Sequence, residues 1–299
     1  MNFLGVYGHV VLDHVVRVPA LPKPNASVSI ESESLFFGGT GANIARMASR
    51  LGVRTALASF VGEDFPKEYY DALKSDGVEL RDLRVVRGHK TPYCYVFSDG
   101  RDQQNFIHQG PMARADDLEL LKHTVKDSRI VHIGTGSPVY YGKIAALAHK
   151  LGREVAFDPG QEIHYVYGPK SFEALLERSR YFFCNEVELK RALEYTGSRK
   201  PSDLLDRVEV LVNTKGAKGA DIYRGAKKYS IPAIKPRKFV DATGAGDAFR
   251  AGFYAALSRN FDTRKCGLAG AAGASLKLES LGAQTNMPDW GAVKKRAGI

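Results

Sequence analysis

The sequence predicts an α/β fold in which helices cover both faces of a mostly parallel sheet, with a smaller β-sheet projecting from it. Two observations predict this class. Short apolar runs typical of buried strands alternate with helical spacing along most of the 299 residues, a pattern that produces a parallel sheet between two helix layers. Two segments, 12–36 and 88–110, interrupt the alternation with β-rich stretches and no helix. We expect one domain over 1–299, with these two segments forming a lid.

The first half of the chain supports this prediction element by element. In 39–51, Ile44, Ala48 and Leu51 fall on one helical face, and Gly52 is typical of a helix end. The predicted elements are strands over 5–11 and 55–61, helices over 39–51 and 65–73, four strand-like stretches within 12–36, and a hairpin over 91–109 around Ser98-Asp99-Gly100.

The second half continues the alternation of strands and helices. The run 139–151 has helical spacing and is closed by Gly152. Two long helices finish the core. The predicted elements are strands over 130–133, 154–158, 181–184 and 208–214, and helices over 139–151 and from about 186, 245 and 263.

Net charge, cysteine spacing and hydropathy limit the ligands and the cell compartment that the sequence predicts. The formal net charge is +10, which favours anionic ligands. The basic stretches 224–238 and 294–296 lack the interleaved aromatic residues of a nucleic-acid surface, so we expect phosphorylated small molecules and no nucleic acid. Cys94, Cys184 and Cys266 form no C-x-x-C pair, which fits a reducing cytosol. No apolar stretch reaches the roughly 18 residues of a membrane helix, so we expect a cytoplasmic protein without a membrane partner.

Small and polar residues follow most of the predicted strands. In an open α/β sheet, ligands bind outside the carboxyl ends of the strands, and these residues are therefore the first candidates for a binding site. The candidates are Asp13, Gly38-Gly39, Asp158, Asn185, Thr214-Lys215-Gly216 and the turn 244–247.

The stretch DATGAGDAFRAGF, residues 241–253, carries the strongest chemical signal. Its two glycines precede Asp247 at the start of a predicted helix. Free N–H groups at a helix N-terminus bind anions, and a carboxylate beside them can accept a proton from an attacking hydroxyl. The pattern is no dinucleotide-binding fingerprint, because Phe249 fills the third small position. From spacing alone, a simple glycine turn with Asp247 as a helix-terminal charge stays an alternative.

Residues 241–253 resemble the signature D-x-T-G-A-G-D-x-F of the ribokinase-like (PfkB) family of carbohydrate and nucleoside kinases, matching all nine positions. Residues 37–43, FGGTGAN, resemble that family's second signature, G-G-x-x-x-N, about 200 residues earlier and in the right order. The resemblance implies a three-layer α/β/α core with a projecting β-sheet lid. It also implies an enzyme that transfers a phosphoryl group from ATP to an alcohol.

The family's catalytic roles map onto the glycine turn. Asp247 would be the base that takes the proton from the acceptor hydroxyl. The amides of Gly244, Ala245 and Gly246 would form the anion hole over the transferring phosphoryl group. This division fits phosphoryl transfer, which depends on positioning and charge stabilisation.

Two further stretches resemble the family's motifs for magnesium and nucleotide. Asn185-Glu186-Val187-Glu188 is similar to N-x-x-E, which implies that Glu188 orders water on Mg²⁺ and that Asn185 faces the ATP phosphates. Residues 214–219 are similar to a T-x-G-x-x-G nucleotide loop. The implied nucleotide contacts are Asn185, Thr214, Lys215, Gly216 and Gly219.

The acceptor would be held near the first strand and the first helix. The resemblance implies that Asp13 grips two sugar hydroxyls, for which an acceptor-only carboxylate is suited. Asn43 would add its amide, while Gly38 and Gly39 would let the sugar lie against the backbone. Four local stretches, GHVVLDHVVRVPALPKPNASVSI, HIGTGSP, FDPGQ and QTNMPDW, resemble the archaeal-type nucleoside kinases within the family. Asp158, at the carboxyl end of a predicted strand, and Ser27 and Gln109, on the predicted lid, are further candidate substrate contacts.

The function expected from the sequence is therefore ATP-dependent phosphorylation of a nucleoside 5′-hydroxyl. One alternative is a sugar or sugar-phosphate kinase, an option that the lid arginines Arg17 and Arg101 keep open. The other is a non-catalytic ligand-binding regulator on the same fold. The lid residues Tyr93 and Phe106 either stack on a base or pack within the small sheet.

Three points stay open at this level. Arg250, three residues after the base, contacts a phosphate, pairs with an acid or faces solvent. Asp241 and Thr243 fall where some family members bind a monovalent cation, so a potassium requirement is undecided. The exposed lid sheet is a candidate contact for a homodimer.

Overall fold

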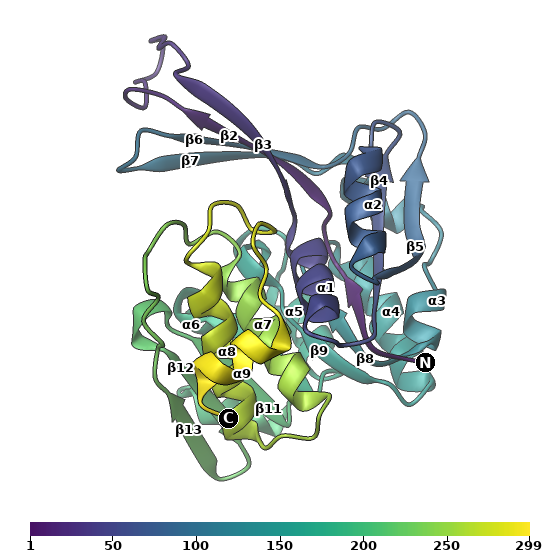
Figure 1. Ribbon diagram of the computed structural model, residues 1–299. Helices are drawn as coiled ribbons and strands as arrows, with labels where there is room; N and C mark the ends of the chain where they lie inside the picture. Colours follow the sequence, from purple (N-terminus) through teal and green to yellow (C-terminus); the bar gives the residue numbers. More distant parts are fainter.

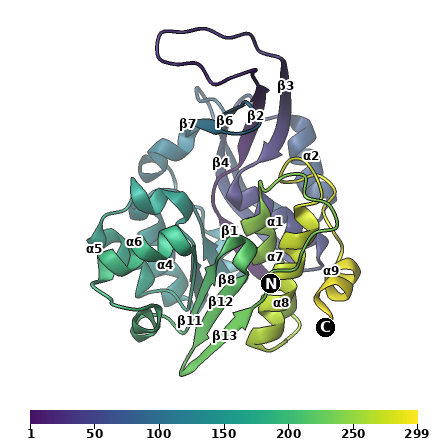
Figure 2. The same cartoon turned by 90° about the vertical axis from the view of Figure 1, so that its left-hand side faces the viewer.

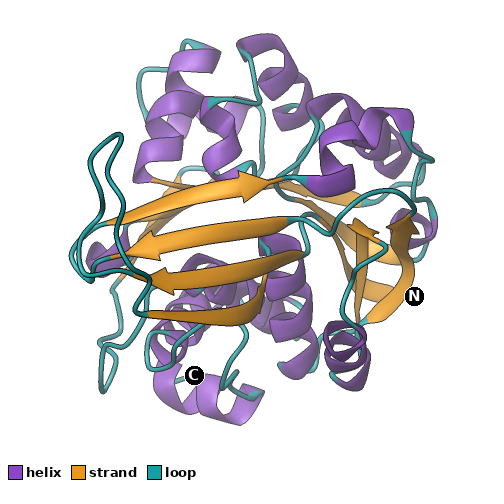
Figure 3. Ribbon diagram, turned by 90° about the horizontal axis from the view of Figure 1, so that it is seen from above, coloured by secondary structure: helices purple, strands orange, loops and turns teal.

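The computed structural model describes all residues, 1–299. A nine-stranded sheet forms its middle layer, and a four-stranded sheet projects from one end of this core (Figure 1). Helices cover both faces of the large sheet, as Figure 3 shows from above. The predicted three-layer α/β/α class with a small separate sheet is confirmed.

The large sheet has the order β13-β12-β11-β10-β9-β8-β1-β4-β5. All its strands are parallel except β12, which runs antiparallel to both neighbours. The middle strands are apolar on both faces because helices cover both, and all eight residues of β4 are buried. The strands are β1 (Asn2–Tyr7), β4 (Thr55–Gly62), β5 (Glu79–Val86), β8 (Ser128–Ile133), β9 (Glu154–Phe157), β10 (Tyr181–Asn185), β11 (Val210–Thr214), β12 (Ala220–Arg224) and β13 (Lys227–Ile231).

Two hydrophobic cores lie on opposite faces of this sheet. One is covered by α1 (Thr40–Arg50), α2 (Lys67–Ser75), α7 (Ala245–Leu257), α8 (Thr263–Lys277) and α9 (Trp290–Ala297). The other is covered by α3 (His123–Lys126), α4 (Pro138–Lys150), α5 (Pro169–Leu176) and α6 (Glu186–Thr196).

Close packing of α7 against α8 fixes the helix that carries the glycine turn. The two helices meet through small residues, because a Cβ on Gly252 would lie 2.4 Å from the Ala269 carbonyl oxygen. A Cβ on Gly273 would similarly lie 2.7 Å from the Ala248 carbonyl oxygen. The N-terminus of α7 is thus held against a rigid neighbour.

The projecting sheet, which we call the lid sheet, has the order β3-β2-β6-β7. Its strands are β2 (Val11–Arg17), β3 (Ser32–Gly38), β6 (Tyr93–Ser98) and β7 (Gln103–His108). β2 runs parallel to β6, while β3 and β7 are antiparallel to their neighbours. The loop 18–31 extends beyond the far end of this sheet (Figure 2).

Several predicted elements need correction. The strand predicted over 5–11 ends at Tyr7, because Gly8, His9 and Val10 lead the chain from the core sheet into the lid sheet. The segment 12–36 lies in two strands rather than four, and much of the remainder is exposed loop. The edge strands β5 and β13 were not predicted, because one face of each carries polar side chains. No helix is both long enough and apolar enough to cross a bilayer.

Candidate active site

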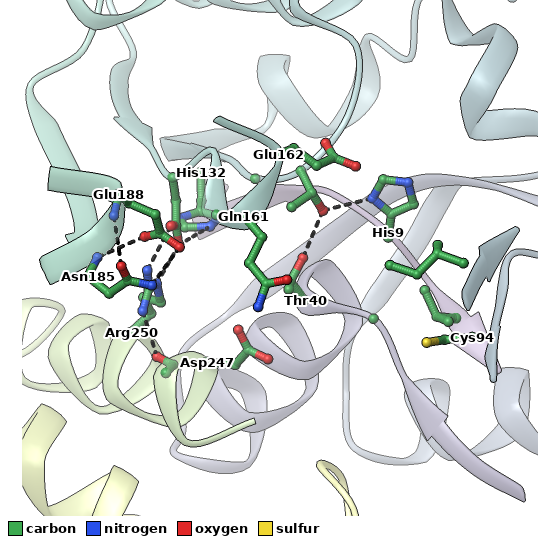
Figure 4. A pocket seen from close by; sticks show the side chains of 18 of the residues that line it. His9, Thr40, Cys94, His132, Gln161, Glu162, Asn185, Glu188, Asp247 and Arg250 are labelled. Carbon is green, nitrogen blue, oxygen red and sulfur yellow. Dashed lines mark hydrogen bonds and ion pairs between the residues drawn. The ribbon is translucent and has the colours of Figure 1, made fainter. Parts of the chain in front are cut away.

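A cavity of about 530 Å³ lies between the lid sheet and the carboxyl ends of the core strands (Figure 4). Its size is typical of small-molecule sites. Residues from both ends of the chain line it. Of the residues predicted from the sequence, it brings together Asp13, Gly39, Gln109, Asp158, Asn185, Glu188, Thr214, Gly216, Gly246 and Asp247.

The glycine turn presents free amide groups to this cavity. Gly244 has φ +77°, in the left-handed region that favours glycine, and a Cβ there would lie 2.8 Å from the Ala283 Cβ. The N–H groups of Gly244, Gly246 and Asp247 have no acceptor in the protein. The Ala245 N–H instead donates to the Ala242 carbonyl (3.1 Å), because the chain turns there. The predicted anion-hole role of Ala245 stays a prediction, whereas the turn has three free donors in this structure.

Asp247 lies at the base of the cavity and is oriented by a chain of hydrogen bonds. The Asn43 Nδ2 donates to the Asp247 Oδ2 (2.8 Å), and the Gln284 Nε2 donates to the Asn43 Oδ1 (2.8 Å). Burial raises the pKa of Asp247 to about 6, and the Asn43 hydrogen bond opposes that rise. A carboxyl with this pKa is ionised at neutral pH and can accept a proton.

Asn43 itself does not line the cavity. Its amide is engaged on both sides by protein groups, and its direct contact with the acceptor stays a prediction. Gln284 extends the chain to the Tyr69 hydroxyl (2.6 Å), which donates to the Gly38 carbonyl (2.6 Å). Asn43 and Gln284 therefore orient the Asp247 carboxylate, and they tie it to the strand beside Asp13.

Asp13 faces the cavity from the lid sheet without a hydrogen-bond partner. Burial raises the pKa of Asp13 to about 7, and the negative charge of Asp247 adds to the rise. Gly38 is required beside it, because a Cβ at that position would lie 1.9 Å from the Asp13 Oδ2. Gly39, with φ +90°, brings the backbone against the His9 carbonyl at the start of α1. An unpaired carboxylate in this setting can accept two hydrogen bonds from a vicinal diol.

Arg250 pairs with Asp158, which answers the question that the sequence left open. The Arg250 Nη2 donates to the Asp158 Oδ1 (2.7 Å), and its Nε donates to the other carboxylate oxygen. His132 completes the cluster: its Nε2 lies 3.5 Å from the Asp158 Oδ2, and its ring packs against Tyr254. Burial lowers the pKa of His132 to about 4, so the imidazole is neutral. Arg250 thus engages both oxygens of Asp158, which also lines the cavity, and the substrate contact by Asp158 stays a prediction.

Asn185 and Glu188 form a reciprocal cap at the start of α6. The Asn185 Oδ1 accepts from the Val187 and Glu188 N–H groups (both 2.9 Å), and the Glu188 Oε2 accepts from the Asn185 N–H (2.8 Å). Glu188 is buried and lines the cavity, and burial raises the pKa of its carboxyl. No group of three or more His, Cys, Asp or Glu side chains could hold a metal directly. This donor set fits Mg²⁺, which keeps several waters and binds through one carboxylate and substrate phosphates.

A second cavity, of about 580 Å³, adjoins the first and shares Thr214, Gly216 and Gly246 with it. Its remaining lining is mainly apolar, which suits a flat aromatic group such as an adenine ring. Gly219 has φ +90°, and a Cβ there would lie 2.0 Å from the Ile231 carbonyl oxygen. Its lining includes Ala217, Gly219, Ala233, Ile234, Pro236, Phe239, Phe249, Ala271 and Leu278.

Lys215 does not line either cavity. Its Nζ donates to the Asp221 carboxylate (2.9 Å), which also accepts from Lys228. The nucleotide contact by Lys215 stays a prediction, with its side chain paired to Asp221 in this structure. The loop contributes Thr214, Gly216 and Gly219 instead.

The structure also places residues in the cavity that sequence reasoning missed. His9 and Thr135 are 2.7 Å apart (Nδ1 to Oγ1), and Thr135 contacts Thr40 (3.0 Å). Glu162 is buried and accepts from the Gln109 Nε2 (3.2 Å). The signal that would have found His9 and Thr135 is their position just after β1 and β8.

Three lid residues do not face the cavity, and two of them take one of the alternatives that the sequence left open. Ser27 is in the exposed loop 18–31 and does not line the cavity. Tyr93 stacks on His108 with ring centroids 4.8 Å apart, and Phe106 packs edge-on against Phe97. Both aromatic residues thus pack within the lid sheet. The residues that face the cavity are Cys94 and Ile107, which pair directly across β6 and β7.

Comparisons with known proteins agree with this geometry. The pfkB family of carbohydrate kinases matches residues 1–290. The chain is 38% identical over 298 residues to a nucleoside kinase of Methanocaldococcus jannaschii, covering 99% of this chain and 97% of that protein. The crystal structure of a nucleoside kinase of that organism, an archaeal member of the ribokinase family, superposes with a TM-score of 0.92 at 36% identity, covering 100% and 98% of the two chains.

Two further relatives differ in the acceptor that their names give. A nucleoside kinase of Methanothermobacter thermautotrophicus is 35% identical, covering 97% of this chain and 93% of that protein. An ATP-dependent ribose-1-phosphate kinase of Halopiger xanaduensis is 30% identical, covering 86% of each chain.

Proposed function

The chain belongs to the pfkB family of carbohydrate kinases, and on that premise we propose that it transfers the γ-phosphoryl group of ATP to the 5′-hydroxyl of a nucleoside. The observation that carries the proposal is the position of Asp247. It lies beside three unpaired amides, at the junction of an acidic cavity and an apolar one. ATP in the apolar cavity would pass its phosphates over Gly246 toward an acceptor in the other.

The acceptor hydroxyl would donate its proton to Asp247 while its oxygen attacks the γ-phosphorus. Asp13 would hold the ribose diol from the lid sheet, so that the 5′-hydroxyl points at the base. The amides of Gly244, Gly246 and Asp247 and the dipole of α7 would stabilise charge on the transferring group. Such positioning and electrostatic effects account for most of the catalysis of phosphoryl transfer.

Asn185 and Glu188 would hold hydrated Mg²⁺ on the phosphate side of the cavity. When bound, Mg²⁺ supplies positive charge to the ATP phosphates. Glu188 can accept hydrogen bonds from magnesium-bound water, since its carboxylate is fixed by the cap of α6. The same cap holds Asn185 at the cavity wall.

The charges of the cavity favour an uncharged acceptor over a sugar phosphate. No lysine lines it, and its single arginine, Arg250, is paired with Asp158. Arg17 and Arg101 lie outside the lining, and the Arg17 guanidinium is 3.6 Å from Glu31. A second phosphate near Asp13 would face carboxylates with no free cation. The acidic lining consists of Asp13, Asp158, Glu162, Glu188 and Asp247.

A base has room and polar partners beyond the ribose. Cys94 and Ile107 offer apolar contact from the lid sheet, and the Tyr165 side chain also lines the cavity. Gln109 and Glu162 can exchange hydrogen bonds with base edges. A free sugar would leave these groups unused.

An acceptor screen tests the proposal. ADP release is measured with inosine, adenosine, cytidine, ribose, ribose 1-phosphate and fructose 6-phosphate, and 5′-deoxyadenosine serves as the matched control. We expect nucleosides to be phosphorylated, and we expect 5′-deoxyadenosine to compete with them without turnover. Turnover of the sugar phosphates alone would show that the acceptor is misassigned. Nucleoside binding without turnover of any acceptor would identify a non-catalytic regulator instead.

The lid sheet keeps its predicted role as a homodimer contact. All six residues of β7 are exposed, and the exposed side chains of Leu35 and Phe106 add apolar surface to the same sheet. Edge strands of this kind pair readily with another chain. Sedimentation equilibrium measures the assembly, and a monomer at all concentrations would remove this part of the proposal.

A further inference from the structure

A completely buried lysine lies close to the anion hole. Lys277 is the last residue of α8, and its side chain is 0% exposed. Its Nζ donates to the Ser280 carbonyl (2.9 Å), which is its only hydrogen bond, and no carboxylate lies within 4 Å of it. Burying an ammonium with so few partners is costly, which makes its presence here informative.

The groups around Lys277 support the glycine turn. The Asp241 Oδ1 accepts from the Thr243 N–H (2.9 Å) and hydroxyl (2.8 Å), and its Oδ2 accepts from the Gly282 N–H (2.8 Å). Asp241 thereby ties the segment before α7 to the loop that follows α8. Ala283 of that loop is the residue against which Gly244 packs.

The Lys277 ammonium supplies a positive charge to this region, in which Asp241 and the Ser280 carbonyl supply oxygen atoms. Burial lowers the pKa of Lys277, and the negative charge of Asp241 opposes that shift. Lys277 and Ser280 bracket a turn in which the Ser280 N–H donates to the Lys277 carbonyl (3.2 Å). The lysine therefore places a positive charge near Asp241, beyond ion-pair distance, and binds the Ser280 carbonyl at the same time.

We propose that the Lys277 ammonium is a tethered cation that replaces a monovalent metal ion beside Asp241, so that the kinase works without potassium. An ammonium has the charge of K⁺ and a similar size, and it likewise binds carbonyl oxygens. The residues present do not fit a second cation, because an ion bound between Asp241 and the Ser280 carbonyl would meet the charge that Lys277 already supplies. Asp241 and Thr243 resemble the positions at which some family members bind such an ion, and Lys277 marks the departure.

The proposal acts through geometry at the anion hole. Lys277 is a positioning residue, since it touches neither cavity. Its charge holds the loop around Ser280 and Gly282, and that loop packs on Gly244. Loss of the Lys277 charge should therefore make the positions of the three free amides less fixed. A small cation that enters the space left by the lysine side chain should restore those positions.

Kinase activity in different chloride salts tests the inference, which rests on the proposed function. The wild-type chain is assayed with Mg²⁺ in tetramethylammonium, sodium, potassium and ammonium chloride at equal ionic strength. We expect rates within about twofold of one another. Stimulation of fivefold or more by K⁺ over tetramethylammonium would overturn the proposal.

Two variants separate charge from space. Lys277→Ala leaves a vacancy, so we expect at least a tenfold loss of kcat in tetramethylammonium and recovery in K⁺ or ammonium. Lys277→Met fills the space without charge, so its loss should not be recovered. Lys265→Ala, on an exposed position of the same helix, is the control and should match the wild type in every salt. Full activity of Lys277→Ala in tetramethylammonium would contradict the proposal.

Thermal unfolding supplies a readout that does not depend on turnover. The Tm of Lys277→Ala should rise in K⁺ or ammonium chloride relative to tetramethylammonium, whereas the wild-type Tm should not respond. If no acceptor is phosphorylated in any salt, the proposed function fails, and the Tm comparison still decides the role of Lys277. If neither variant folds, the salt series on the wild-type chain decides it.

Discussion

Arg250 and Asp158 form a buried ion pair immediately behind the glycine turn. Both side chains are 8% exposed, and the Arg250 Nη2 donates to the Asp158 Oδ1 at 2.7 Å. The Arg250 Nη1 also donates to the Gly246 carbonyl (3.1 Å), which belongs to the turn itself. The arginine therefore links the end of β9 to the first turn of α7, and it contributes to the site by holding that turn in place.

Removing one partner of this pair should destabilise the fold more than removing both. Arg250→Met leaves the Asp158 carboxylate buried and uncompensated, and we expect a loss of about 3–5 kcal/mol in the free energy of unfolding. The double variant Arg250→Met, Asp158→Leu should recover part of that loss. Urea denaturation of both variants measures the difference. An equal or larger loss in the double variant would contradict this account.

Asp247→Asn should lower activity and raise stability. General-base catalysis contributes about 10²–10⁴ in rate, and kcat should fall by that factor while nucleoside binding persists. The folded-state pKa of about 6, against an ordinary 3.8, means that the folded state holds the proton more tightly. Stability therefore falls as the pH rises from about 4 to 6 and stays reduced at pH 7. The Tm of the variant should exceed that of the wild type at pH 7.5, and the gap should close near pH 4.

The control for this variant is Asp206→Asn, an exposed aspartate that makes no side-chain hydrogen bond. It should leave both kcat and the Tm unchanged. A wild-type kcat in Asp247→Asn would remove Asp247 from the mechanism.

The pH dependence of catalysis should reflect the two raised pKa values of the cavity, those of Asp247 and Asp13. Asp247 and Asp13 must both be ionised to accept hydrogen bonds, and their pKa values are about 6 and about 7. We expect kcat/KM to be flat above about pH 8 and to fall as the pH drops through 7 and 6. In Asn43→Ala, the hydrogen bond that lowers the pKa of Asp247 is lost, so the acidic limb should move to higher pH. An acidic limb in the same place would argue that Asn43 does not orient the base.

Gly38→Ala should weaken acceptor binding. The added Cβ would meet the Asp13 Oδ2 at 1.9 Å, so the carboxylate must move away from the position in which it faces the cavity. We expect the KM for the nucleoside to rise at least tenfold, with little change in the KM for ATP. Gly142→Ala is the matched control, because a Cβ there meets nothing within 4 Å and the helical site gains stability. Equal KM values for the two variants would show that Asp13 does not hold the acceptor.

Glu188→Gln should raise the magnesium requirement. The amide keeps an oxygen that can accept from the Asn185 N–H, so the helix cap survives, but the negative charge is lost. Outer-sphere partners of a metal typically contribute 10–100-fold, and we expect the half-saturating Mg²⁺ concentration to rise by about tenfold. Glu186→Gln, an exposed neighbour in the same turn, should not change it. A shift of equal size in both variants would assign the effect to surface charge.

The sequence predicts the core fold well because its buried strands and amphipathic helices have strong periodicity. The prediction misses β5 and β13, because a strand at or near the sheet edge needs few apolar residues. It also misplaces the end of the first strand, because the apolar run 5–11 contributes residues to both β1 and β2. Motif spacing likewise picks out Asp247, Asn185 and Glu188, which line the cavity from the starts of two helices. Motif spacing does not reveal that Asp158 pairs with Arg250, or that Asn43 donates to Asp247, because the partners in each contact lie far apart in the chain. Lys277 escapes prediction for the same reason, since a lysine at a helix end is normally exposed.

The attachment of Asp13 to the lid sheet and of Asp247 to the core has a consequence for ATP economy. Water is always present as a competing nucleophile, and it is smaller than any nucleoside. In the proposed complex, a nucleoside would reach from the lid sheet to α7, with its diol on Asp13 and its 5′-hydroxyl on Asp247, whereas a water molecule would lack the contact with the lid sheet. With these proposed roles, placing one acid on the lid sheet and the other on the core would disfavour hydrolysis of ATP, because only a molecule that contacts both would be held in line for attack.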